Sequence, residues 1–251
     1  MATDGFLWYP AGTPTLKGYK ITFQNPNILI GYRNTIFYVI VGVLLSVFMT
    51  AIGAYIVSRS NFKIRGVLMA MITVTLFFGG GMIPKFLIVK NLGLYNTVWA
   101  VILPGVISSW NLIVMRTFFQ GIPVGLEEAA LIDGANDWQI FIKVILPLSK
   151  PVLAVMVLYY GVGIWNSWFE PMLYLRDRTK FPLQLFLREI LMQNTPASGQ
   201  KASLSELQAD SLYTELLQYT TMVVSTLPIL CVYPFLQKYF VKGVMIGSVK
   251  G

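Results

Sequence analysis

The chain has 251 residues, of which 55% are apolar and 12% are charged, and its formal net charge is +8. A soluble domain cannot bury so large an apolar fraction, so the composition predicts an integral membrane protein. Histidine is absent and Cys231 is the single cysteine, which excludes histidine-based catalysis, an intrachain disulfide and a thiolate metal cluster. No metal site is predicted.

The basic residues are spread between the apolar stretches rather than gathered in one run. Such a distribution is typical of loops that contact solvent and lipid headgroups, and it argues against nucleic-acid binding. Membrane lipid is therefore the first partner that the sequence implies.

Residues 1–33 form a polar segment with several prolines, and charged residues stand where a signal peptide would have its apolar core. We expect them to form an extracytoplasmic N-terminal segment. The transmembrane domain is then expected to cover residues 34–251.

Five stretches without charge follow, each long enough to cross a hydrocarbon core, which takes about 20 helical residues. They are apolar on all faces, whereas the strands of a β-barrel would alternate. The predicted fold class is all-α, a polytopic transmembrane helical bundle. The five stretches cover residues 34–58, 66–84, 91–115, 151–169 and 216–237.

The loop over residues 59–65 carries three basic residues and no acid. This density in a short loop favours a cytoplasmic position. Alternation along the chain then places residues 116–150 and the C-terminus in the cytoplasm, and residues 175–215 outside. The summed basic residues on the two sides are nearly equal, so the orientation rests on this one loop.

Residues 121–148 are too polar to cross the membrane, and they predict a helix, a sharp turn and a second helix. Pro123 suits a first turn, and Glu127 and Glu128 suit the positive N-terminal end of a helix. Gly134 supplies a turn with positive φ, and Asn136 or Asp137 can cap the second helix. That helix is expected to run to Pro147.

The first of these helices is expected to be amphipathic. An interfacial helix lying on lipid explains amphipathicity alone, but the excess of acidic residues is opposite to what an anionic membrane attracts. Ala129 and Ala130 let another backbone approach closely, and Glu128 remains available for a charged contact. The segment therefore favours docking into the groove of a partner protein.

The segment resembles the EAA signature of importer permeases, E-A-A-x3-G-x9-I-x-L-P. Glu128-Ala129-Ala130, Gly134 and the run 144–147 match it, with Val144 in place of the usual isoleucine. Residues 111–123 and 132–135 resemble the maltose-type carbohydrate permeases, and the LplC-type branch of Gram-positive bacteria is most similar. The resemblance extends over residues 16–251.

The resemblance implies a type I permease fold of an ATP-binding cassette importer and a sugar or oligosaccharide as substrate. The implied partners are a second homologous permease, a cytoplasmic ATPase dimer and an extracytoplasmic sugar-binding lipoprotein. The loop at 121–150 would seat on the ATPase through Glu128, Ala129, Ala130, Gly134 and Pro147. The tail at 247–251 is expected either to touch the ATPase or to be a frayed end.

Members of this family usually have six spans, so we expect that the first span of the family is missing from this sequence. The chain has no Gly-x4-Gly-Lys-Ser/Thr loop, so ATP and Mg²⁺ would bind the partner ATPase and this chain would need no cofactor. The multi-pass location would be the bacterial cytoplasmic membrane.

Polar and aromatic residues inside the spans are candidates for the substrate path, because they are costly in lipid. Interfacial belts or contacts between helices are an alternative explanation for each. Gly79–Gly81 predict either an unwound segment or close helix packing. The candidate path residues are Asn111, Tyr159, Trp165, Asn166 and Trp168.

Two other classes of function remain as alternatives. An ion-coupled secondary transporter would need acids within the membrane, yet Glu170 is the acid nearest a span and lies at its end. A membrane-embedded enzyme would need a nucleophile or a metal constellation, which this sequence lacks. A transport subunit without enzymatic activity of its own is the predicted function.

Overall fold

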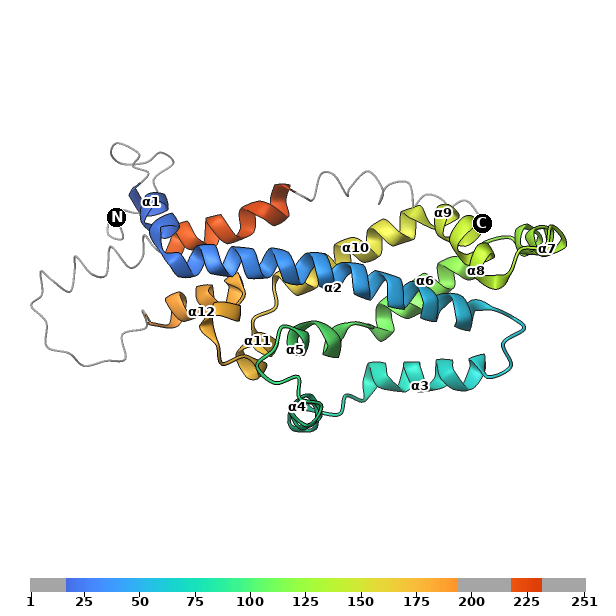
Figure 1. Cartoon of the computed structure of the whole chain (residues 1–251), viewed down its shortest axis with the longest axis horizontal. Coiled ribbons are helices and arrows are strands. Elements are labelled where there is room, and N and C mark those ends of the chain that lie inside the picture. The colour runs from blue at the N-terminus through green and yellow to red at the C-terminus, as the bar shows by residue number, and fades with distance from the viewer. Residues whose placement is uncertain (1–16, 194–217, 232–251) are drawn as a thin grey trace, which may run out of the picture.

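The computed structural model describes residues 17–193 and 218–231, and every regular element in this part of the chain is helical. Figure 1 shows a long α2 with the other helices along its length and across its ends. The helices are α1 (Lys17–Gln24), α2 (Pro26–Ser58), α3 (Arg65–Phe77), α4 (Met82–Asn91), α5 (Trp99–Ile102), η1 (Leu103–Gly105), α6 (Ser109–Gln120), α7 (Gly125–Ile132), α8 (Asp137–Ile140), the π-helical η2 (Phe141–Ile145), α9 (Leu146–Leu148), α10 (Lys150–Trp165), α11 (Phe169–Tyr174), η3 (Arg178–Lys180) and α12 (Leu183–Gln193), and a further helix covers 218–231.

The central helix α2 packs against α6, α10 and α12. Its 33 residues begin at Pro26, where Asn25 caps the helix by accepting a hydrogen bond from the Asn27 N–H. The span predicted from residue 34 begins after the charge of Arg33, whereas the helix begins eight residues earlier. Arg33 is exposed and the helix continues through it, so the described part of the predicted N-terminal segment is also helical.

The spans predicted at 66–84 and 91–115 are each bent within their length, and a third bend lies just before the span predicted at 151–169. The axes of α3 and α4 differ by 117°, those of α5–η1 and α6 by 49°, and those of α8–α9 and α10 by 81°. Within the described residues, α2 alone is an uninterrupted helix long and apolar enough to cross a membrane, and up to four spans result if each bent pair is counted once. The predicted stretch at 216–237 is described only over 218–231.

Residues with positive φ mark where one predicted span is interrupted and where another begins late. The break between α3 and α4 contains Gly79–Gly81, and Gly81 has φ +81°. A Cβ added at Gly79 or Gly80 would meet no atom within 4 Å, so these two glycines mark an unwound segment and not a close packing of helices. The span predicted at 91–115 begins only at Trp99, because Gly93 and Asn96 turn the backbone with positive φ.

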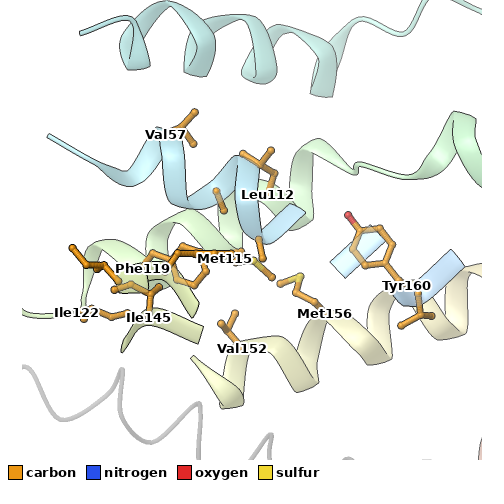
Figure 2. Close-up of a cluster of buried hydrophobic side chains, with 14 residues drawn as sticks. Val57, Leu112, Met115, Phe119, Ile122, Ile145, Val152, Met156 and Tyr160 are labelled. Carbon is orange, nitrogen blue, oxygen red and sulfur yellow. The ribbon is translucent and has the colours of Figure 1, made fainter. Parts of the chain in front are cut away.

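The largest hydrophobic core cluster lies between α2, α6, η2 and α10 (Figure 2). Met115, Ile145 and Met156 are completely buried at its centre. Toward one end of the cluster, the Tyr160 hydroxyl lies 2.7 Å from the Thr50 hydroxyl. The core therefore ends in a polar contact that joins α2 to α10.

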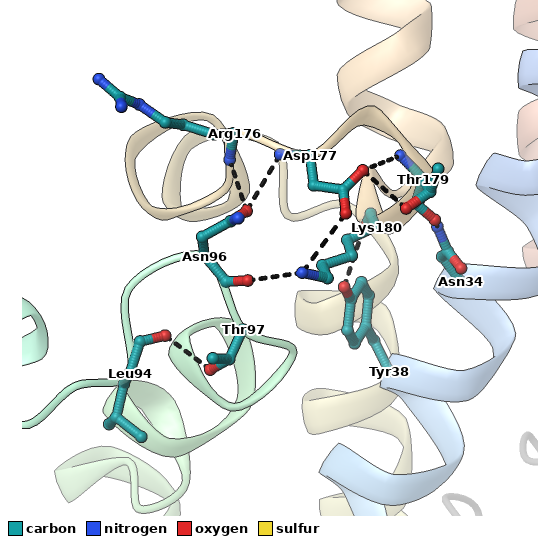
Figure 3. Close-up of polar contacts among 9 residues, drawn as sticks. All are labelled: Asn34, Tyr38, Leu94, Asn96, Thr97, Arg176, Asp177, Thr179 and Lys180. Atoms are coloured by element: carbon teal, nitrogen blue, oxygen red, sulfur yellow. Dashed lines mark hydrogen bonds and ion pairs between the residues drawn. The ribbon is translucent and has the colours of Figure 1, made fainter.

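A second network of polar contacts holds the end of the bundle that lies away from α7 (Figure 3). The Asn96 side-chain oxygen accepts hydrogen bonds from the backbone N–H groups of Arg176 and Asp177, each at 3.0 Å. Lys180 donates to the Asn96 carbonyl at 2.8 Å, and the Tyr38 hydroxyl donates to the Lys180 carbonyl at 2.8 Å. These bonds join the α4–α5 turn, η3 and α2.

Close contact between α2 and α12 generates a testable prediction. A Cβ at Gly31 would lie 2.9 Å from the Leu183 Cα, a backbone atom that cannot rotate away. Gly31→Ala should therefore destabilise the purified protein by about 1–3 kcal/mol, the usual cost of overpacking. Thermal unfolding in detergent measures the loss. Gly66→Ala is the control, since its Cβ meets no atom within 4 Å, and equal unfolding temperatures for the two variants would contradict the prediction.

Candidate functional site

Helix α7 lies across one end of the bundle, beside α8 and α9 (Figure 1). Glu127 and Glu128 stand in its first turn, where the helix dipole favours negative charge. It ends in two hydrogen bonds, from the Gly134 N–H to the Leu131 carbonyl at 3.0 Å and from the Ala135 N–H to the Ala130 carbonyl at 2.9 Å. This Schellman arrangement needs a left-handed residue at Gly134, whose φ is +79°.

The second helix of the segment begins at a capping box. The Gln139 N–H donates to the Asn136 side chain, and the Asn136 N–H donates to the Gln139 side chain, both at 2.9 Å. Asn136 is therefore the capping residue, whereas the sequence alone predicted either Asn136 or Asp137 in that role. The predicted helix, turn and helix are present, with a π-helical stretch before Pro147 that the sequence did not suggest.

The surface of α7 is open. No residue of α7 is buried, and Ile132 is 86% exposed. Glu128 and Ala129 are exposed, Ala130 packs partly against the core cluster, and Gly134 has no atom within 4 Å of an added Cβ. Small, apolar and acidic groups thus form one accessible surface, which suits contact with another protein.

Pro147 lies apart from this surface. It stands exposed in α9, just before the 81° bend into α10. The structure therefore groups four of the five predicted docking residues on α7 and its turn, and it places the fifth at the joint between the segment and the membrane helix. The predicted tail contact at 247–251 lies outside the described residues.

Glu127 and Glu128 have different surroundings. Glu127 forms an ion pair with Arg59, and the two side chains are 12% and 22% exposed. The guanidinium also lies 4.1 Å from the centre of the Tyr55 ring. Burial lowers the pKa of Arg59, while Tyr55 and Asp137 act in the opposite direction. Sequence patterns do not indicate this pair, because Arg59 and Glu127 belong to segments that are far apart in the chain.

A cavity of about 290 Å³ lies inside the bundle, next to the break between η1 and α6. Asn111 and Tyr159, both predicted path residues, line it. Tyr160 also lines it, and its hydroxyl accepts a hydrogen bond from the Ser108 N–H at 3.0 Å. Further polar groups come from Ser46, Ser108, Ser167 and Glu170. Hydroxyl, amide and aromatic groups therefore surround one space.

The other three predicted path residues make local contacts outside the lining of this cavity. The Trp165 indole N–H donates to the Ser225 carbonyl at 3.1 Å, which joins α10 to helix 218–231. The Asn166 amide donates to the Val162 carbonyl of its own helix at 3.0 Å. Trp168 lies under the Arg188 guanidinium, 3.8 Å from the ring centre.

A second cavity of about 480 Å³ lies beside the unwound segment between α3 and α4. Gly79, Gly80 and Gly81 line it, and so does Glu170, which also lines the first cavity. Glu170 forms an ion pair with Lys85 at 2.5 Å.

Ser46, which lines the first cavity, could not be identified as a cavity residue from the sequence. Hydroxyls within apolar helices often bond to their own backbone, so a serine in a span does not by itself indicate a cavity.

Comparison with known proteins identifies the family to which this chain belongs. Residues 31–246 match the family described as "Binding-protein-dependent transport system inner membrane component". Protein LplC of Bacillus subtilis (strain 168) is 42% identical over 252 residues, which cover 100% of this chain and 84% of LplC. The polygalacturonan/rhamnogalacturonan transport system permease protein YtcP of the same organism is also 42% identical, over 98% of this chain and 85% of YtcP.

A solved structure is similar over most of its length. It is a crystal structure of a bacterial ABC transporter involved in the import of the acidic polysaccharide alginate, with a TM-score of 0.83 and 33% identity, covering 95% of this chain and 84% of that chain. These matches confirm the predicted all-α permease fold and the resemblance to the LplC-type branch. They also confirm a transport subunit in place of an enzyme. The chain therefore belongs to the family of binding-protein-dependent transport system inner membrane components.

Proposed function

We propose that the chain forms part of the translocation path for a sugar or oligosaccharide and docks through α7 onto a cytoplasmic ATPase. The observation that carries the docking role is the exposed surface of Glu128, Ala129 and Gly134 at a helix whose C-terminal end is capped by hydrogen bonds. The named relatives support a saccharide substrate, since YtcP is described for polygalacturonan and rhamnogalacturonan, and the solved transporter for alginate.

The remaining partners follow from the same proposal. A second homologous permease completes the path, an ATPase dimer binds ATP and Mg²⁺, and an extracytoplasmic sugar-binding lipoprotein delivers the substrate. This chain then needs no cofactor of its own. The proposal also assigns the cytoplasmic side of the bacterial cell membrane to α7 and the C-terminus.

The ion-coupled alternative lacks an observation in its favour. Glu170 would be its acid nearest the membrane, but this carboxylate is ion-paired with Lys85. ATP-driven import is therefore the proposed function.

Docking is tested by co-purification with the products of the neighbouring genes. A tagged wild-type chain should recover an ATPase subunit, and Glu128→Lys combined with Gly134→Asp should lose it, because the variant reverses the exposed charge and strains a backbone with φ +79°. Gly66→Asp is the matched control, since its added Cβ also meets no atom within 4 Å. Recovery of the ATPase by the double variant would remove the docking role from α7.

The substrate path is tested with two asparagines. Asn111→Leu removes an amide that lines the 290 Å³ cavity, and it should reduce uptake by about three- to tenfold, as expected for one lost hydrogen bond. ATPase recovery should not change. Asn166→Leu is the control, because that amide lies outside the cavity lining and bonds to Val162 and Gln184. Equal uptake by the two variants would contradict the assignment of the cavity.

Orientation is tested with a single cysteine in a Cys231→Ser background, because Cys231 is itself exposed. Ser60→Cys lies in the exposed basic loop after α2 and should react with a membrane-impermeant maleimide only in inside-out vesicles. Arg176→Cys, at the opposite end of the bundle, should react only in right-side-out cells. The reverse pattern would place α7 outside the cell.

A further inference from the structure

The ion pair between Arg59 and Glu127 connects two elements with different roles. Glu127 lies in the first turn of α7, and Arg59 is the residue that ends α2. Among the described residues, this pair joins the first turn of α7 directly to α2. The peptide chain itself leads from α7 to α6 in one direction and to α8 in the other, so the ion pair is a lateral connection that the chain does not supply.

The surroundings of Arg59 hold its side chain in place. Its guanidinium lies over the Tyr55 ring, and the Tyr55 ring lies 5.0 Å from the ring of Phe141. Phe141 in turn lies 5.7 Å from Trp138 of α8. A continuous row of contacts therefore links α7, the end of α2, η2 and α8. Aromatic side chains bury large apolar surfaces and pack with specific geometry, so this row holds the four elements in a defined arrangement.

The pair is partly buried, so removing one partner has a different effect from exchanging both. Two nitrogens of Arg59, Nε and Nη2, are buried without a hydrogen-bond partner in the described part of the chain. Removing Glu127 would leave the partly buried cation without its counter-charge, whereas exchanging the two residues would keep opposite charges at these two positions. A structural role of either side chain alone would not show this dependence on the partner.

We propose that Arg59 and Glu127 are positioning residues for coupling, and that their ion pair carries the movement of α7 to the membrane helix α2. Glu128, which is exposed on the same turn, is left to face the ATPase. Of the two adjacent glutamates, Glu128 then contacts the partner ATPase and Glu127 contacts the helix bundle. This inference rests on the proposed docking of α7 onto the ATPase.

The experiment uses the complete complex, purified with its ATPase and placed in liposomes with the binding protein. The variants are Arg59→Gln, Glu127→Gln and the exchange of Arg59→Glu with Glu127→Arg. Three quantities are measured for each: the ATPase recovered with the tag, the rate of ATP hydrolysis, and the substrate imported per ATP. Lys63→Gln is the control, because it removes an exposed charge from the same loop.

Both single variants should keep the ATPase and continue to hydrolyse ATP, and they should import at least about fivefold less substrate per ATP, the lower range of coupling energies between sites. The exchange should restore a large part of that ratio, and Lys63→Gln should match the wild type. Thermal unfolding of each complex identifies a variant that has lost its fold. If a single variant has lost its fold, the substrate imported per ATP by the exchange variant is the result that tests the inference.

Two results would overturn the inference while the proposed function stands. One is a wild-type ratio of import to hydrolysis in both single variants. The other is loss of the ATPase from Glu127→Gln, which would make Glu127 a docking contact. Absence of the ATPase from the wild-type complex would overturn the proposed function and this inference together.

Discussion

A bilayer offers no water to an unpaired backbone N–H or C=O, and this constraint governs where the helices of this protein can break. Each break in the described residues has a local solution. At the start of α6, the Tyr160 hydroxyl accepts from the Ser108 N–H. At the bend before α10, the Ser149 N–H donates to the carbonyls of Ile145 and Leu146 at 3.0 and 3.1 Å. The α3–α4 break lines a cavity.

Two of these breaks adjoin a cavity. The 290 Å³ cavity adjoins the interruption at Gly105 and Ser108, and the 480 Å³ cavity adjoins Gly79–Gly81. Irregular backbone inside a membrane is tolerated where it lines such spaces. Because Glu170 belongs to both linings, one side chain on α11 connects two features whose origins lie in different parts of the sequence. The same residues that weaken the helices thus shape the interior.

Sequence patterns predicted the helical class, helix α7 and the turn that follows it, because these features depend on local properties. Gly134 needs only its own backbone conformation, and Asn136 needs only the N–H three residues later. The bends were harder to predict, since hydropathy does not distinguish a straight apolar helix from two shorter ones at 117°. The Arg59–Glu127 pair could not be predicted at all, because its two residues are far apart in the sequence. They meet only because the end of α2 lies beside α7 in the folded chain.

The C-terminal cap of α7 has a mechanical consequence. Its last backbone groups are bonded within the segment, through Gly134 and Ala135, and α8 begins with its own reciprocal cap at Asn136 and Gln139. We expect that the segment can tilt against the membrane helices without breaking the hydrogen bonds that close its ends. Side-chain contacts such as the packing of Ala130 and the Arg59–Glu127 ion pair then add to the covalent connections in setting how stiff this joint is.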